Sequence, residues 1–138
     1  MSDGTSIIAW FESLGRADGA RVGGKNASLG ELTARLVPMG IRVPQGFATT
    51  ADAYWAFVGS AGIEPAIGDA LAAYRSGKAS LDVTGTAIRR ALLDAPFPQA
   101  LARPIAAAYH ELSRRAGKTD VAVAVRSSAT AEDLPDAS

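Results

Sequence analysis

Apolar residues recur along the chain with both strand-like and helix-like spacing, which predicts an α+β fold, rich in helices and with a few short strands. The apolar run from Ile7 to Phe11 predicts a strand. Leucines with helical spacing then predict a helix that begins near Asn26 and ends near Val37, because Pro38 disfavours helical geometry in the residue before it.

Apolar and polar residues alternate around positions 41–48, and this alternation predicts an extended, hairpin-like segment. Thr49 or Thr50 is expected to cap the next helix, with Asp52 closing a capping box that starts at Thr49. The predicted buried face of that helix consists of Tyr54, Phe57 and Val58.

The middle of the chain is predicted to be helical and offers little chemistry. Its core-facing positions are expected to be Ile63, Ile67 and Leu71, followed by Ile88 and Leu92. The prolines within residues 94–98 separate this region from a last helix, which ends at Gly117 and either starts near Arg103 or bends at Pro104. The apolar face of that helix is predicted to carry Leu101, Ile105, Ala108 and Leu112.

The richest chemistry follows an apolar run at residues 121–125, which predicts a short buried strand. Arg126 comes directly after it and offers a planar fork of donors that matches phosphate oxygens. Ser127, Ser128 and Thr130 follow and add hydroxyl donors. The carboxylates of Glu132 and Asp133 come next and are weak candidates for holding a divalent cation. A strand that leads into a polar surface loop is the alternative interpretation.

A second candidate motif contains Gly23, Gly24 and Lys25 immediately before the first predicted helix. Paired glycines allow backbone amides to turn outward, and a helix N-terminus beside a lysine can bind an anion. The alternative is a glycine turn with a solvated lysine. A P-loop is disfavoured, because Asn26 stands where that pattern needs the serine or threonine that binds magnesium.

Composition and charge narrow the class of protein. The chain has 138 residues, 48% of them apolar, which is enough for one core. Its 14 basic and 14 acidic residues cancel and form no blocks, which disfavours nucleic acid or an anionic membrane as a partner. The lack of cysteine fits a cytoplasmic protein, and neither a signal peptide nor a membrane-spanning stretch is expected.

Three segments together resemble the phosphoenolpyruvate synthase (pyruvate, water dikinase) family. They are Gly-Gly-Lys-Asn-Ala-Ser-Leu-Gly-Glu at residues 23–31, Val-Pro-Gln-Gly-Phe-Ala-Thr-Thr-Ala-Asp-Ala-Tyr at 43–54, and Ala-Val-Arg-Ser-Ser-Ala-Thr-Ala-Glu-Asp-Leu-Pro-Asp-Ala-Ser at 124–138. The resemblance implies that residues 1–138 are the first part, or first lobe, of an ATP-grasp-type nucleotide-binding domain that is truncated at its C-terminal end.

The resemblance also implies chemistry. Lys25 and Arg126 match the family's lysine and arginine that contact the phosphates of ATP, with Mg²⁺ as the accompanying ion. The implied parent enzyme converts ATP, pyruvate and water to phosphoenolpyruvate, AMP and phosphate through a phosphohistidine, and is a homo-oligomer. Domains outside this chain would supply the pyruvate site and that histidine, since His110 is expected to lie on a helix surface.

Two other interpretations remain open at this level. Rifampin phosphotransferase shares both the glycine motif and the arginine motif, and its different acceptor is chosen by other domains. A small nucleotide-binding module without catalytic activity is the second alternative.

Overall fold

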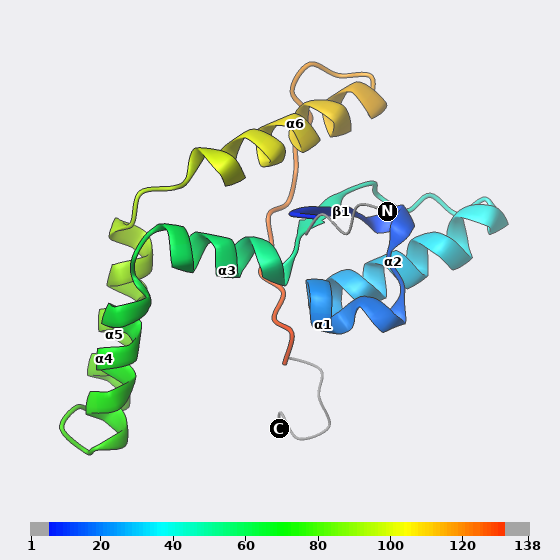
Figure 1. The fold of residues 1–138 in the computed structure, drawn as a ribbon. Coiled ribbons are helices and arrows are strands. Elements are labelled where there is room, and N and C mark those ends of the chain that lie inside the picture. The colour runs from blue at the N-terminus through cyan, green and yellow to red at the C-terminus, as the bar shows by residue number, and fades with distance from the viewer. Residues whose placement is uncertain (1–5, 132–138) are drawn as a thin grey trace, which may run out of the picture. The chain divides into compact units, whose positions relative to one another are not determined.

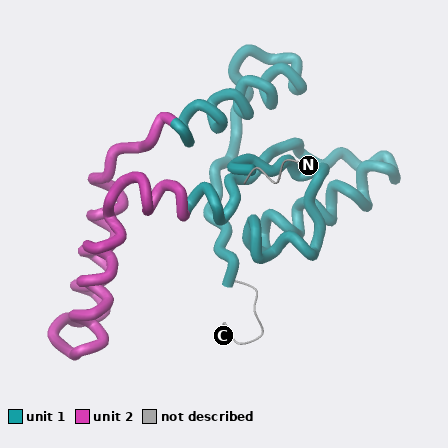
Figure 2. Tube along the Cα trace, in the orientation of Figure 1, with its two compact units in different colours: residues 1–54, 100–138 teal, residues 55–99 magenta. Residues whose placement is uncertain are grey.

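The computed structural model describes residues 6–131 and divides the chain into two compact units (Figures 1 and 2). Unit 1 contains residues 1–54 and 100–138, and unit 2 contains residues 55–99. Both candidate motifs therefore belong to unit 1.

A two-stranded antiparallel sheet lies in unit 1. It pairs β1 (Ile8–Trp10) with β2 (Phe47–Thr49), and Ala9 stands opposite Ala48 at its centre. The predicted first strand is confirmed. The predicted hairpin is wrong, because β2 finds its partner at the start of the chain, and residues 41–46 contain no strand.

Short helical turns lead from β1 to the first long helix. They are η1 (Phe11–Ser13), η2 (Arg16–Asp18) and α1 (Gly19–Val22), and they precede α2 (Gly24–Leu36) and η3 (Val37–Met39). The helix predicted from about Asn26 is confirmed, although it begins two residues earlier. Helical geometry from Gly19 to Val22 is also incompatible with a P-loop at this place.

The core of unit 1 is built largely from small residues. Its buried members are Ala9, Leu14, Val22, Ala27 and Ala48, with Phe11 packed against them. The residues that α2 buries are Ala27 and Gly30, whereas Leu32 is 46% exposed. The leucine spacing thus located the helix but not its buried face, because α2 approaches Leu14 too closely for a large side chain.

Helix α3 (Ala51–Ser60) begins at a threonine cap and runs from unit 1 into unit 2. The Thr50 hydroxyl accepts a hydrogen bond from the Ala53 amide at 3.4 Å, so Thr50 is the capping residue. The predicted buried face is wrong at Tyr54, which is 49% exposed, and right at Val58, which is 2% exposed. Ala53 takes the buried position beside the cap.

Unit 2 consists mainly of a helical hairpin formed by α4 (Glu64–Arg75) and α5 (Leu81–Asp94). The Ser80 hydroxyl caps α5 by accepting from the Val83 amide at 3.3 Å. The predicted core-facing positions are only partly confirmed, since Ile63 is buried and Leu71 is 36% exposed. The rings of Phe57 and Phe97 are in contact within this unit, with centroids 5.7 Å apart.

The last helix, α6 (Gln99–Arg115), contains Pro104 within its first turns. Leu101, Ala108 and Leu112 are buried as predicted. The helix ends at a glycine cap near the predicted place, where Gly117 has φ +66° and the Lys118 amide donates to the Ser113 carbonyl at 2.9 Å.

The segment after α6 is held at its start but forms no strand. Val121 donates its amide to the Ser113 hydroxyl and accepts from the Tyr109 hydroxyl at 3.0 Å. The predicted buried strand at residues 121–125 is wrong for the described structure, where Val123 is 49% and Val125 is 92% exposed. The physical reason is that a strand needs a neighbour for its backbone groups, and within residues 6–131 none pairs with this segment.

Candidate functional site

The candidate site is organised by a turn in which a single glycine separates α1 from α2. Gly23 is buried and has φ +82° and ψ +156°, a conformation that is accessible essentially only to glycine. Its amide donates to the Gly19 carbonyl at 2.8 Å, and its carbonyl accepts from the Ala27 amide at 3.0 Å. The glycine thus ends one helix and starts the next without a linker.

The segment that follows α6 packs directly on this turn. The Ser128 hydroxyl donates to the Val22 carbonyl at 3.1 Å, across 106 positions of sequence. The Gly24 amide donates to the Ala129 carbonyl at 3.4 Å. A Cβ atom added at Gly23 would lie 2.1 Å from the Ser128 hydroxyl oxygen, so only glycine allows this approach. In Figure 1 the orange segment runs past the end of α1 at this point.

The Val22 carbonyl is the meeting point of three segments. It lies at the C-terminal end of α1, where carbonyl groups have no N–H donor from a further turn of the same helix. Besides the Ser128 hydroxyl, the Asn26 side-chain amide donates to it at 2.8 Å from the first turn of α2. A carbonyl oxygen has two lone pairs, so both donors can be accepted together.

The structure brings together only part of the predicted site. Ser128 contacts the glycine turn, whereas Arg126, Ser127 and Thr130 are exposed in the same segment. Lys25 is also exposed and stands between Gly24 and Asn26, which are both hydrogen-bonded as described above. The candidate carboxylates Glu132 and Asp133 lie outside the described residues.

Sequence reasoning missed the contribution of Asn26. Its position four residues after the last residue of α1 is the available signal, because an amide side chain in a first helical turn can donate to the carbonyl before it. Asn26 belongs to the motif at residues 23–31, but its sequence position alone gave it no role, and the structure assigns it this hydrogen bond.

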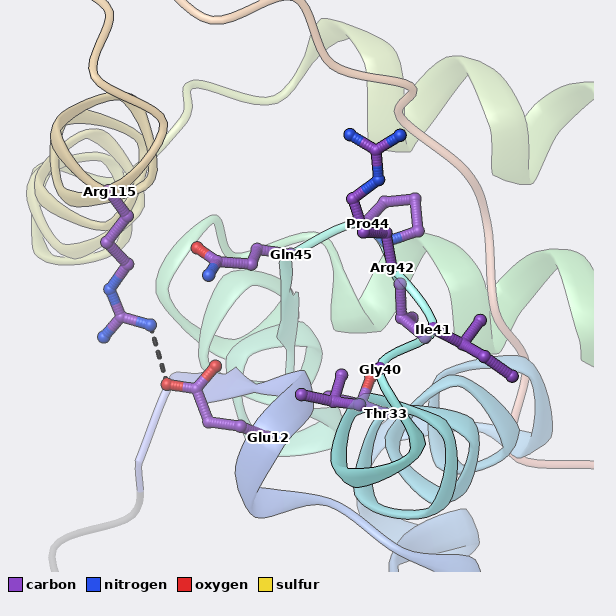
Figure 3. Close-up of a pocket in the computed structure, with 10 residues that line it drawn as sticks. Glu12, Thr33, Gly40, Ile41, Arg42, Pro44, Gln45 and Arg115 are labelled. Atoms are coloured by element: carbon purple, nitrogen blue, oxygen red, sulfur yellow. Dashed lines mark hydrogen bonds and ion pairs between the residues drawn. The ribbon is translucent and has the colours of Figure 1, made fainter.

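A separate groove of about 730 Å³ lies at the other end of α2 (Figure 3). It is lined by residues of unit 1 from the C-terminal half of α2, the following loop and an ion pair: Glu12, Thr33, Val37, Gly40, Ile41, Arg42, Val43, Pro44, Gln45 and Arg115. The Arg115 guanidinium donates to the Glu12 carboxylate at 2.6 Å and lies 3.9 Å from the centre of the Trp10 ring. The groove therefore contains none of the predicted phosphate-binding residues.

The same arginine takes part in a second charged contact on α6. Arg114 and Arg115 donate hydrogen bonds to the Glu111 carboxylate, and these bonds lower the pKa of Glu111 to about 2. This cluster ties the end of α6 to η1 and leaves the glycine turn untouched.

No group of three histidine, cysteine or acidic side chains that could hold a metal ion comes together within residues 6–131. Over the same residues, no helix combines the length and the apolar character that crossing a membrane requires. Within the described residues, the glycine turn and the segment packed on it are therefore not accompanied by such a group.

A comparison with known protein families matches most of this chain to one family. Residues 19–138 match the family described as pyruvate phosphate dikinase, AMP/ATP-binding domain. The chain therefore belongs to this family, which confirms the resemblance that its motifs indicate.

The chain is similar to curated relatives that are phosphoenolpyruvate synthases. The phosphoenolpyruvate synthase of Neisseria meningitidis serogroup B is 52% identical over 134 residues, covering 96% of this chain and 17% of the relative. The phosphoenolpyruvate synthase of Synechocystis is 48% identical over 139 residues, with 97% and 17% covered. That of Escherichia coli K12 is 46% identical over 138 residues, with 96% and 16% covered. The chain thus spans about 17% of the length of the relatives that it matches.

Proposed function

We propose that this chain is the front part of the ATP-binding domain of a phosphoenolpyruvate synthase, with an ATP-grasp-type fold completed by further residues. The complete enzyme would convert ATP, pyruvate and water to phosphoenolpyruvate, AMP and phosphate through a phosphohistidine, as a cytoplasmic homo-oligomer. The family match and the relatives named above support this function over that of a rifampin phosphotransferase.

The observation that carries the proposal is the packing of the Ser128–Ala129 segment on the Gly23–Gly24 turn. Two motifs from distant parts of the sequence meet there, and each has an exposed cation close by in the sequence, Lys25 in one and Arg126 in the other. In our proposal these two side chains bind the phosphates of ATP, and the exposed hydroxyls of Ser127 and Thr130 add neutral donors.

Magnesium enters this proposal only as an ion that accompanies the nucleotide. The described residues do not form a cage for it, and Glu132 and Asp133 remain weak candidates outside the described region. Phosphoryl transfer depends largely on positioning and charge neutralisation, and those are the tasks that we assign to Lys25 and Arg126.

Substitutions in the complete protein test the assignment. We expect Arg126→Lys and Lys25→Ala each to slow AMP formation from ATP, because a preorganised donor or charge is lost. Each loss should correspond to about 2–4 kcal/mol of transition-state stabilisation. Arg35→Lys is the matched control for the arginine: it lies at the far end of α2, about 15 Å along the helix from Lys25 at ~1.5 Å per residue. Lys118→Ala is the control for the lysine.

The measurement is the initial rate of AMP release at saturating ATP and pyruvate. Near-normal rates for both Arg126→Lys and Lys25→Ala, with circular dichroism unchanged, would contradict the site assignment. Equal losses in the two control variants would show that the effect is not local to the phosphate motifs.

The 138-residue chain alone should bind ATP weakly and show no dikinase activity. Cations that are exposed to water interact with phosphate through a high dielectric and are screened by salt. We therefore expect a dissociation constant of about 1 mM or weaker, or roughly −4 kcal/mol, with little preference for adenine. Titration calorimetry decides this, and a micromolar, adenine-selective isotherm would show that the chain forms a complete nucleotide pocket.

A further inference from the structure

We propose that Ser128 and Asn26 are positioning residues that fix the two phosphate motifs to each other through the Val22 carbonyl, and that Ser128 is not a phosphate ligand. The inference rests on the proposed function, because the role of the contact is to place Lys25 and Arg126. It reassigns Ser128, which the sequence grouped with Ser127 and Thr130.

The hydrogen-bond geometry assigns Ser128 to this role. Its hydroxyl has one proton, and that proton is donated to the Val22 carbonyl at 3.1 Å. The hydroxyl therefore has no proton left to donate to a phosphate oxygen while this bond is made. Ser128 is also half-buried, in contrast to its exposed neighbours Ser127 and Thr130.

Asn26 makes a second hydrogen bond to the same oxygen. Its amide donates to the same Val22 oxygen at 2.8 Å, so one carbonyl holds both the first turn of α2 and the segment that contains Arg126. The Gly24 amide adds a third link by donating to the Ala129 carbonyl. We call these three hydrogen bonds the Val22 clamp.

Both proposed phosphate-binding residues lie close in sequence to residues of the Val22 clamp. Lys25 stands between Gly24 and Asn26, each of which makes one of the three bonds, and Arg126 stands two residues before Ser128. Gly23 is part of the same device, because a Cβ atom there would overlap the Ser128 hydroxyl oxygen. An error of about 1 Å in such placement is enough to weaken preorganised contacts strongly.

The test is a double-mutant cycle on ATP binding by the complete protein. We expect Ser128→Ala to weaken ATP binding about three- to tenfold, the value of one neutral hydrogen bond. In a Lys25→Met background the same substitution should change the dissociation constant by less than about twofold, because the placement of Lys25 relative to Arg126 no longer matters once one of the two cations is lost. Ser127→Ala is the matched comparison, and as a direct donor it should cost the same factor in both backgrounds.

A second readout is made without nucleotide. Amide hydrogen exchange at Gly24 and Ala27 should speed up in Ser128→Ala, because the start of α2 loses its anchor, and should stay unchanged in Ser127→Ala. Asn26→Ala should reproduce the effect of Ser128→Ala on both exchange and affinity, and it serves as the second variant should Ser128→Ala fail to fold.

The outcomes are distinguishable. Unchanged exchange together with an equal loss of affinity in both backgrounds would make Ser128 a direct phosphate ligand and overturn the proposal. Normal ATP affinity in Ser128→Ala would also overturn it. If Lys25→Met itself binds ATP normally, the proposed phosphate site is wrong, and the exchange measurement still decides whether the clamp holds the turn.

Discussion

Units 1 and 2 differ in how far apart in the sequence their contacting residues lie. In unit 1, Ser128 bonds to Val22 across 106 positions, and Arg115 bonds to Glu12 across 103. In unit 2, the helices that pack together are consecutive, and a characteristic ion pair joins Arg90 to Asp94, four residues away on one helix. Unit 1 can therefore bring distant motifs to one place, whereas the packing of unit 2 is mainly local.

The two units also differ in what they bury. Unit 1 packs its sheet and α2 around alanines and a glycine, so that backbones approach closely. Unit 2 exposes large apolar side chains on its hairpin, with Leu81 at 69% and Leu93 at 83%. The core positions of unit 1 should therefore be sensitive to changes of a single methyl group, and the exposed leucines of unit 2 should tolerate them.

The largest difference is expected from shortening a leucine in each unit. Leu14 is 4% exposed in the core of unit 1, so Leu14→Ala should lower the free energy of unfolding by about 2–5 kcal/mol. Leu93→Ala removes the same atoms from an exposed position and should change it by less than about 0.5 kcal/mol. Denaturant unfolding of the chain, with hydrogen exchange to resolve the units, measures both. Equal losses would contradict the comparison.

The same difference explains how much of the fold the sequence predicted. Local signals located α2, the Thr50 cap, the break after Asp94 and the end of α6, because spacing, capping hydroxyls, prolines and glycines act within a few residues. The pairing of β2 with β1 was missed, since adjacency in the sequence favoured a hairpin and the long-range partner leaves no local trace.

The site divides in the same way. The glycine turn was predictable, because Gly23 and Gly24 signal an unusual backbone before a helix. The meeting of that turn with residues 128–129 was not, since nothing in the spacing specifies contact across more than 100 positions. The apolar run at residues 121–125 has strand-like residues but no partner strand within the described chain, so its composition alone predicted a buried state that the structure does not show.

A smaller effect of opposite sign in the two units is expected from adding a methyl group to a helical glycine. A Cβ atom at Gly30 in α2 would lie 2.5 Å from atoms of Leu14, including a backbone oxygen. Gly30→Ala should therefore destabilise unit 1 by about 1–3 kcal/mol through overpacking. At Gly68 in α4 nothing lies within 4 Å, so Gly68→Ala should stabilise by about 0.5–1 kcal/mol through helix propensity.

Thermal and denaturant unfolding of the two glycine variants give the signs directly. Stabilisation by Gly30→Ala would mean that α2 can move away from Leu14, and the close packing that we describe would then not constrain unit 1. A loss of stability in Gly68→Ala would show that this open position of α4 has a neighbour in solution.

The smallest effect concerns the charged cluster on α6. The hydrogen bonds from Arg114 and Arg115 lower the pKa of Glu111 from its ordinary value of 4.5 to about 2. A carboxylate whose pKa is lower in the folded state stabilises the fold fully above its unfolded pKa, and this contribution disappears as the pH falls toward the folded pKa. The stabilisation by Glu111 should therefore be present above about pH 4.5 and be lost between about pH 4.5 and pH 2.

Glu111→Gln removes this titration, so the variant should be less stable than the parent chain near neutral pH, and the two should converge as the pH approaches 2. The effect should be modest and should shrink in high salt, because the side chains of the cluster are partly exposed and screened.

Asp94→Asn is the matched change in unit 2, where the partner Arg90 is 82% exposed and only one ion pair is lost. Its effect on stability near neutral pH should be smaller than that of Glu111→Gln. Stability curves of the three chains across this range provide the measurement, and a steeper acid dependence in Glu111→Gln than in the parent would reverse the sign argued here. Because Arg115 also bonds to Glu12 and lies over Trp10, the response of Glu111→Gln reports on a contact that spans unit 1, whereas that of Asp94→Asn reports on a single turn of helix.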